Sequence, residues 1–383
     1  MTAEQTPGGD RKIEIDDPSV EVLVVGAGHV YGEKIKPALS KMASLSKCVL
    51  VDPDPAVFTE ETDSRTLIGS YKDLEINLPP EFASKVAALI LTPDKLEPIA
   101  TLSKKGITKF IVEKPIASNT KEADLLELLV KEKGLKVEAI DHYLPKIVPL
   151  MMLLGKVKPD DPKWDWVEQP DNPSGVLQEL CGSLDKMIGP IEGVVVNIVE
   201  GGKFGQDLLT RGYLRNDPVK GGMLLDLATH AFTPLLAAGI IDPQNLRINN
   251  AQRYIILENR CDLVKADIGR PEDHATVQMS IQLGSMTIPF LLEVGKTFDD
   301  GGLWNIVLRG SRGTAHVGLR TGDCTTVCPN EGKPILLKLK KEDPYVRVFE
   351  NARRTFAGES DGNLGASLQA IRIIDKIKEI SGR

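Results

Sequence analysis

Short hydrophobic runs alternate with longer segments of helical periodicity between Val20 and about residue 141. The hydrophobic runs are VEVLVVG, CVLVD, VAALILT, FIVEKP and LKVEAID, at 20–26, 48–52, 86–92, 110–115 and 135–141. The segments between them predict helices over about 30–45, 99–105 and 123–134. Nearly continuous hydrophobic strands separated by helices are typical of a parallel sheet that is covered on both faces. The pattern therefore predicts an α/β domain with a dinucleotide-binding architecture.

A glycine-rich turn joins the first predicted strand to the first predicted helix. Gly26 permits the bend, and Gly28 would let the backbone approach a pyrophosphate at the helix N-terminus. His29 and Val30 continue this turn, whereas Tyr31 occupies the position where a third small residue is usual. The turn is thus either a phosphate site for a dinucleotide or only a tight connection, and the glycine spacing alone does not decide.

Asp52 ends the second predicted strand, where a carboxylate can accept hydrogen bonds from the adenosine ribose hydroxyls. Because this negative charge would repel a 2′-phosphate, we expect NAD rather than NADP as the cofactor. The alternative is that Asp52 only caps the VDPDP turn. Thr92 and Pro93, after the third strand, and Glu113, at the end of the fourth, complete the expected cofactor-binding set together with Lys114.

Lys114 follows the fourth predicted strand and lies at the edge where open α/β sheets bind ligands. Partial burial at this edge would suit its ammonium group to acid or base catalysis. The next residue is Pro115, which fixes the backbone and is able to form a cis peptide bond. Taken alone, a lysine after a strand is more often a solvated surface charge.

The segment GGMLLDLATHAFTPLL spaces Asp226 and His230 four residues apart, which predicts a carboxylate and an imidazole on one helix face. A neutral imidazole can take a proton from a hydroxyl, and a carboxylate can orient the imidazole or bind a neighbouring hydroxyl. The alternative is an ion pair that borders the core. No third ligand stands out beside this pair, and Cys324 and Cys328 lack a second pair of ligands, so we expect no metal site.

Four motifs in the order VVGAGHVYG, VD, VEKP and GGMLLDLATH resemble those of the Gfo/Idh/MocA oxidoreductase family, the glucose-fructose oxidoreductase and inositol dehydrogenase group. The resemblance implies an N-terminal Rossmann dinucleotide-binding domain. It also implies a C-terminal mixed α/β domain with a large, open, predominantly antiparallel sheet. We therefore expect a flexible N-terminal tail at 1–19, the NAD-binding domain at 20–141, and the substrate-binding and oligomerisation domain at 142–383.

The same resemblance implies hydride transfer to or from a secondary hydroxyl or keto carbon of a sugar, sugar phosphate, nucleotide sugar or cyclitol. Lys114 and His230 would be the acid/base groups, and Asp226 would position the substrate or the histidine. Arg211, in the polar stretch before Asp226, would either contact the substrate or be solvated. The broad sheet implies a homodimer or homotetramer. Two alternatives stay open: a non-catalytic NAD-responsive regulatory protein, and glycoside cleavage by NAD-dependent oxidation and elimination.

The segment DHYLPK, residues 141–146, is similar to the DHYLGK motif of glucose-6-phosphate dehydrogenases. This similarity implies that His142, Tyr143 and Lys146 hold a sugar phosphate. An imidazole, a phenol and an ammonium group together supply suitable donors for such an anion. The alternative is that the segment is only a structural crossover between the domains.

A formal net charge of −7 at pH 7 gives no electrostatic reason to expect nucleic acid or an anionic membrane as a partner. No apolar run of about 18 residues predicts a membrane span, and the polar first residues lack the apolar core of a signal peptide. The 5 scattered cysteines suit a reducing compartment. We therefore expect a soluble, cytoplasmic protein with a small, sugar-like substrate.

Overall fold

The computed structural model divides the chain into two compact units. It describes residues 13–28, 30–42, 45–58, 65–168, 176–201, 213–217, 221–257, 262–266, 270–283, 285–297, 302–320 and 324–382. The first unit comprises Met1–Ala117, Asp124–Ile140 and Phe349–Gly362, and the second comprises Ser118–Ala123, Asp141–Val348 and Asn363–Arg383.

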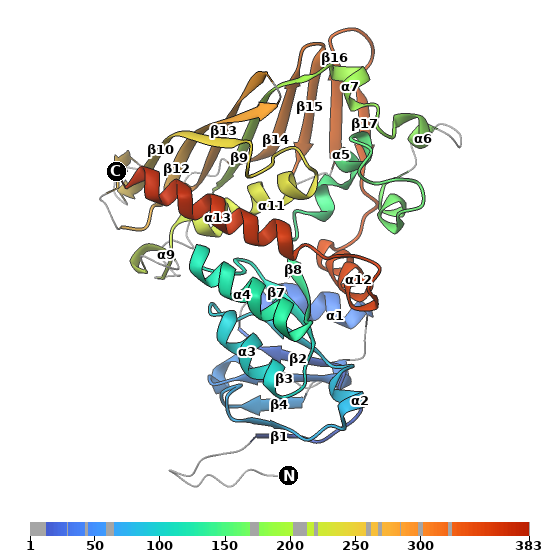
Figure 1. The fold of residues 1–383 in the computed structure, drawn as a ribbon, viewed down its shortest axis with the longest axis vertical. Coiled ribbons are helices and arrows are strands. Elements are labelled where there is room, and N and C mark those ends of the chain that lie inside the picture. Colours follow the sequence, from blue (N-terminus) through green and yellow to red (C-terminus); the bar gives the residue numbers. More distant parts are fainter. Residues whose placement is uncertain are drawn as a thin grey trace. The chain divides into compact units, whose positions relative to one another are not determined.

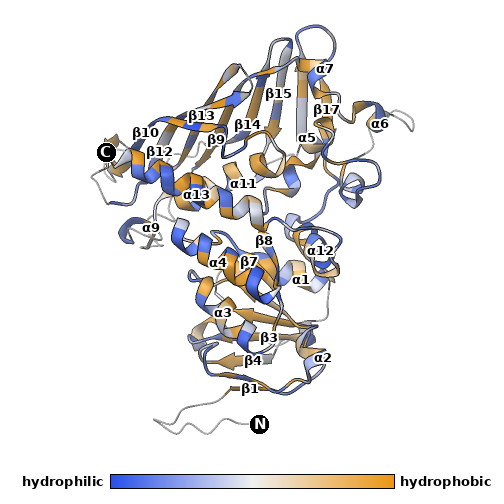
Figure 2. Ribbon diagram, viewed as in Figure 1, coloured by the Kyte–Doolittle hydropathy of each residue, from blue (hydrophilic) through white to orange (hydrophobic). Residues whose placement is uncertain are grey.

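A six-stranded parallel sheet forms the framework of the first unit (Figure 1). In spatial order its strands are β4 (Arg65–Ile68), β3 (Cys48–Asp52), β2 (Val22–Val25), β6 (Ala87–Ile90), β7 (Lys109–Glu113) and β8 (Lys136–Ile140). The central strands consist almost entirely of buried aliphatic residues, which Figure 2 shows as hydrophobic ribbon. Strands of this composition are stable where helices cover both sheet faces. The predicted parallel α/β fold is confirmed.

Helices and short strands complete the first unit. The helical elements are η1 (Tyr31–Ile35), α1 (Lys36–Met42), η2 (Leu45–Lys47), η3 (Pro55–Phe58), α2 (Pro80–Ala83), α3 (Leu96–Lys104), α4 (Thr120–Lys133) and α12 (Pro344–Ala357), of which α4 and α12 begin within the second unit. The carboxylate of Glu138 in β8 is buried and accepts hydrogen bonds from Asn351 and Thr355 of α12, both at 2.9 Å. These bonds help to explain why residues 349–362 belong to the first unit, for which the sequence offered no signal.

Residues 13–15 form strand β1 (Ile13–Ile15), which pairs in parallel with β5 (Leu74–Ile76). We expected these residues within a flexible tail at 1–19, whereas the structure places them in a strand. The alternation of IEI buries Ile15, which is 2% exposed, and the backbone hydrogen bonds to β5 order the segment. Residues 1–12 lie outside the described part of the chain.

A topological switch point lies at β2, because β3 and β6 pair with it on opposite sides. The chain leaves β2 toward one side of the sheet and later returns to the other side. In open α/β sheets, ligands bind beyond the carboxyl ends of the strands at such a point. The glycine turn that follows β2 is therefore placed where the sequence predicted a nucleotide site.

A nine-stranded mixed sheet forms the framework of the second unit, in the order β11-β10-β12-β13-β9-β14-β15-β16-β17. Its strands are β9 (Ile191–Glu200), β10 (Leu246–Leu257), β11 (Asp262–Lys265), β12 (His274–Leu283), β13 (Met286–Lys296), β14 (Leu303–Gly310), β15 (Gly313–Gly318), β16 (Cys324–Pro329) and β17 (Ile335–Lys338). The neighbouring strands β9 and β13 run parallel, and every other described pair in this sheet is antiparallel. The expected large, predominantly antiparallel sheet is confirmed.

Helices cover part of this sheet, and Figure 1 shows the long helix α13 extending across it. The helical elements are η4 (Pro145–Ile147), α5 (Val148–Leu153), η5 (Pro162–Trp166), α6 (Val176–Leu180), α7 (Leu184–Ile188), α9 (Tyr213–Asn216), α10 (Met223–Asp226), α11 (Thr229–Ala237) and α13 (Leu364–Ser381). Helix α11 is buried over most of its length and packs against α13. Among the described helices, none has the length and hydropathy needed to cross a membrane.

Candidate active site

The glycine turn after β2 contains two glycines, and the structure gives a different reason for a glycine at each position. Gly26 has a φ of +89°, and a Cβ atom there would lie 3.0 Å from Thr92 Cγ2 and 3.1 Å from its backbone nitrogen. At Gly28, by contrast, a Cβ atom would meet no protein atom within 4 Å. The fold itself therefore requires glycine at residue 26, whereas the space beside Gly28 suits a ligand that approaches the backbone.

Asp52 reaches the same turn from the end of β3. The backbone N–H of Ala27 donates to Asp52 Oδ2 at 2.8 Å, and the N–H of Asp54 donates to Oδ1 at 2.9 Å. The second bond is the turn cap that the sequence left open as an alternative. Because each carboxylate oxygen can accept more than one hydrogen bond, capping does not prevent Asp52 from binding hydroxyls.

The other residues expected at the nucleotide edge follow β6, β7 and the glycine turn. Thr92 Oγ1 donates to Asp94 O at 2.7 Å, and Pro93 is exposed beside it. Glu113 is buried at the end of β7, and the half-buried Lys114 forms a cis peptide bond with Pro115. After the glycine turn Val30 is half-buried, and His29 lies outside the described residues.

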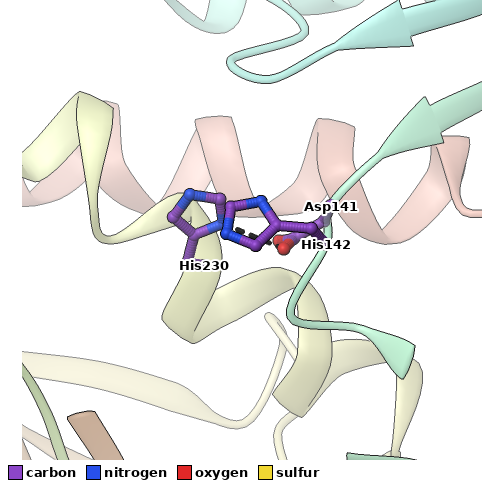
Figure 3. A group of neighbouring side chains, drawn as sticks. All are labelled: Asp141, His142 and His230. Atoms are coloured by element: carbon purple, nitrogen blue, oxygen red, sulfur yellow. Dashed lines mark hydrogen bonds and ion pairs between the residues drawn. The ribbon is translucent and has the colours of Figure 1, made fainter. Parts of the chain in front are cut away.

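A buried pair in the second unit joins His230, in the first turn of α11, to Asp141, which directly follows β8 in the sequence (Figure 3). His230 Nδ1 lies 2.9 Å from Asp141 Oδ1, and both residues are 2% exposed. The backbone N–H of Tyr143 donates to the same Oδ1 at 2.9 Å. Asp141 Oδ2 is buried and has no hydrogen-bond partner among the described residues.

The carboxylate expected beside His230 was that of Asp226, four residues earlier. Asp226 is the last residue of α10, two residues lie between it and α11, and the hydrogen bonds of the described residues pair His230 with another carboxylate. The carboxylate that contacts His230 belongs instead to Asp141. The sequence contained a signal for it, since Asp141 ends the fifth hydrophobic run and begins DHYLPK, but its spacing from His230 gave no reason to pair them.

Aromatic rings surround this pair. The ring centroids of Tyr143 and His142 lie 4.5 Å and 4.9 Å from that of His230. Tyr345 stacks on His142 at 5.4 Å, and its hydroxyl lies 3.5 Å from His142 Nδ1. Trp304 lies 5.4 Å from Tyr143. Tyr345 and Trp304 carried no sequence signal, because the contacts depend on the folding of distant segments.

Tyr143 is 5% exposed. Burial, followed by the nearby carboxylates of Glu200 and Asp141, raises the pKa of the Tyr143 phenol far above its ordinary value. The phenol therefore stays protonated throughout the physiological pH range. It is available as a hydrogen-bond donor but not as a proton acceptor.

Lys146 is buried, and its ammonium group donates to Leu319 O at 2.7 Å and approaches Arg320 O at 3.5 Å. It also lies 5.3 Å from the centre of the Tyr143 ring. These contacts tie DHYLPK to the segment after β15, which favours the structural crossover over a phosphate contact for Lys146. Arg211, the other expected substrate contact, lies outside the described residues.

No model of a protein family matches the sequence, and no curated protein sequence matches it. Solved structures match it in fold. A variant of a 3-ketoreductase from Actinomadura kijaniata, in complex with TDP-benzene and NADP, gives a TM-score of 0.63 at 17% identity, covering 97% of this chain and 98% of that chain.

Two further enzymes match at similar levels. UDP-N-acetylglucosamine 3-dehydrogenase from Acidithiobacillus ferrooxidans matches with a TM-score of 0.62 at 14% identity, covering 94% of this chain and 97% of that chain. An oxidoreductase from Thermotoga maritima matches with a TM-score of 0.63 at 14% identity, covering 97% of both chains. This chain has their fold. At such low identity the likeness establishes the fold over nearly the whole chain, and function must be argued from the site.

Proposed function

We propose that this chain is a nicotinamide-dependent oxidoreductase that transfers a hydride to or from a secondary hydroxyl or keto carbon of a sugar-like substrate. The observation on which the proposal rests is the buried pair of His230 and Asp141, 2.9 Å apart. A carboxylate at Nδ1 orients the imidazole so that Nε2 can accept a proton, and it stabilises the imidazolium that forms. The likeness in fold to sugar oxidoreductases supports the same activity.

His230 would accept the hydroxyl proton during oxidation and return it during reduction. Asp141 would hold the ring and compensate the positive charge, while the protonated Tyr143 would donate a hydrogen bond to the substrate oxygen. Lys114, at the end of β7, remains the second candidate acid/base group. Asp226 remains a candidate for substrate binding, since it is not the partner of His230.

The first unit would hold the dinucleotide, with its phosphates beside Gly28 and a ribose on Asp52. The bound nicotinamide would accept or supply the hydride. The matching enzyme from Actinomadura kijaniata is complexed with NADP, but in this chain two carboxylates, Asp52 and Asp54, stand at the end of β3. Because they would repel a 2′-phosphate, we propose NAD as the preferred cofactor. A higher kcat/KM with NADP than with NAD would contradict this preference.

The activity is tested by nicotinamide absorbance with NAD and NADP and a panel of free sugars, inositols, their phosphates and nucleotide sugars. We expect turnover of at least one class, and we expect His230→Ala to abolish most of that turnover without changing NAD affinity. Turnover limited to phosphorylated members would restore His142, Tyr143 and Lys146 as a phosphate subsite. Tight NAD binding without turnover of any member would favour the non-catalytic alternative.

A further inference from the structure

Two imidazoles and one carboxylate lie together in the second unit. Atoms of Asp141, His142 and His230 that could bind a metal all lie within 4.8 Å of one another, and Figure 3 shows the two rings beside the carboxylate. Sequence reasoning looked for a third ligand beside Asp226 and found none, because the set forms only after Asp141 and His142 are brought to α11. Nitrogen and carboxylate ligands in this combination suit divalent first-row transition metals.

Two members of this set are already fixed. Asp141 and His230 are 2% exposed and hold each other at 2.9 Å, and the Tyr143 N–H further fixes Asp141. Asp141 Oδ2 is buried without a hydrogen-bond partner among the described residues. Leaving such an oxygen without a partner is costly, and a cation would satisfy it directly.

The third member, His142, is only half-buried. Zinc lies about 2.0–2.2 Å from nitrogen and oxygen ligands, so tetrahedral ligand atoms are about 3.3 Å apart. The present spread of up to 4.8 Å must therefore contract when an ion binds. His142 is less buried than the other two ligands, and its ring stacks on Tyr345, so its side chain has more room than theirs to move toward an ion.

The surrounding charges favour a cation. The carboxylates that act on the neighbouring phenol of Tyr143 are those of Glu200, Asp141 and Asp226. The cations in this neighbourhood are Lys146, 5.3 Å from the Tyr143 ring, Lys296, which pairs with Glu200, and Arg320, which lies over the Trp304 ring. Lys296 is engaged by Glu200, whereas the carboxylate of Asp141 has an oxygen without a hydrogen-bond partner among the described residues.

We propose that Asp141, His142 and His230 form a binding site for a divalent transition-metal cation, best suited to Zn²⁺, and that the bound ion reversibly inhibits the enzyme. The inhibition rests on the proposed function. An ion on Nε2 would occupy the nitrogen that accepts the substrate proton, whereas an ion on Nδ1 would displace the proton there and leave the ring proton on Nε2, so either mode prevents proton acceptance. Because the imidazoles must be neutral to bind the metal, Zn²⁺ affinity should fall as the pH is lowered.

The binding is tested on the metal-stripped full chain by competition between the protein and a chromophoric chelator for Zn²⁺. We expect one ion per chain in the wild type and at least about tenfold weaker binding in His142→Ala and His230→Ala. His316→Ala is the matched control, because His316 is exposed on β15 and outside the cluster. The site is overturned if the wild type binds no Zn²⁺, or if His142→Ala binds it as tightly as His316→Ala does.

Two measurements distinguish this site from a cysteine site and from nonspecific binding at the surface. Co²⁺ bound by cysteine produces an intense thiolate charge-transfer band, and such a band would overturn the assignment to the histidines. Zn²⁺ should raise the thermal unfolding midpoint of the wild type but not that of folded His142→Ala. In the activity assay, Zn²⁺ should lower turnover, and EDTA should restore it.

The inhibition and the proposed oxidoreductase activity can fail separately. If no substrate is turned over, the proposed function and the inhibition fail together, whereas the Zn²⁺ competition still decides whether the site exists. If Zn²⁺ binds in a manner that requires His142 but turnover continues unchanged, the inhibition is wrong while both the site and the oxidoreductase activity stand.

Discussion

The variant Asp141→Asn tests whether Asp141, which contacts His230 in the structure, is the carboxylate that assists His230 in catalysis. The sequence spacing had suggested Asp226 for this role. In the native protein, Asp141 Oδ1 lies 2.9 Å from His230 Nδ1 and also accepts the Tyr143 N–H at 2.9 Å. Asparagine keeps the size and one oxygen acceptor but removes the charge. If its oxygen keeps both bonds, the imidazolium formed during oxidation loses its compensating carboxylate. If the amide is flipped, its NH₂ faces Nδ1 and forces the proton onto Nε2, where it blocks proton acceptance.

The expected loss follows from the contribution of a general base. Such a group contributes about 10²- to 10⁴-fold to the rate, which corresponds to about 2.7–5.4 kcal/mol of activation free energy. We expect Asp141→Asn to reduce kcat/KM by an amount in this range. Stability should also fall by about 1–3 kcal/mol, because one end of the amide lies at the Oδ2 position, where no described residue offers a partner.

The assay compares kcat/KM for oxidation across a pH series in four proteins: wild type, Asp141→Asn, Asp226→Asn and His230→Ala. Asp226→Asn should act mainly on KM, since we propose Asp226 for substrate binding and the carboxylate at His230 Nδ1 is that of Asp141. Combining Asp141→Asn with His230→Ala should cost little more than His230→Ala alone, because the pair acts as a unit. NAD affinity and urea denaturation serve as controls for folding and cofactor binding.

A catalytic pair of Asp141 and His230 is refuted if folded Asp141→Asn keeps kcat/KM within about threefold of the wild type while Asp226→Asn loses about 10²-fold or more. Fully additive losses in the double variant would also contradict it, since they would mean that Asp141 and His230 act independently.

Three further predictions concern stability and cofactor binding. Gly28→Ala should weaken NAD binding at least about tenfold, because the added Cβ would occupy the space beside the phosphates. Its free energy of unfolding should change by no more than about 0.5 kcal/mol, because that Cβ meets no protein atom within 4 Å. Gly32→Ala, where a Cβ also meets no protein atom, is the control. Gly222→Ala should destabilise the protein by at least about 2 kcal/mol in urea denaturation, because φ is +89° and the Cβ would lie 2.5 Å from Glu272 Oε1. Burial lowers the pKa of His274 below its ordinary value. As the pH drops below about 6.5, the unfolded chain takes up a proton before the folded one does, so the free energy of unfolding should fall. His274→Gln should flatten this pH dependence, and an unchanged slope would show that His274 is not its cause.

Much of the first unit was predictable because its signals are local. The hydrophobic runs identified β2, β3, β6, β7 and β8, since a strand buried on both faces must be apolar at nearly every position. Strand β4, with the sequence RTLI, and strand β5, with LEI, are too short and too mixed for such a pattern. Residues after a parallel strand always reach the same sheet edge, so the sequence could place Gly26, Asp52 and Lys114 there.

In the second unit, the candidate site depends on contacts between residues far apart in the sequence, which local sequence patterns do not predict. Asp141 follows a recognisable strand, but its contact with His230 joins residues 89 positions apart and depends on how α11 packs. The spacing of Asp226 and His230 predicted a shared helix face only on the assumption that the helix continues. The segment LLDLATHAF contains no glycine or proline, the residues that usually mark the end of a helix, so nothing in the sequence indicated that the helix is interrupted.

The break between α10 and α11 links the structural role of Glu272 to the chemistry of His230. Glu272 Oε1 accepts the N–H of Leu224 at 2.8 Å, and its backbone oxygen accepts that of Met223 at 3.0 Å, so both bonds fix the start of α10. Gly222 must be a glycine to make room for this carboxylate. Glu272 fixes the start of α10 only a few residues before His230, which lies in the first turn of α11, so it also restricts where α11 begins. The same anchor therefore helps to hold the His230 imidazole beside Asp141, whose Oδ1 lies 2.9 Å from Nδ1.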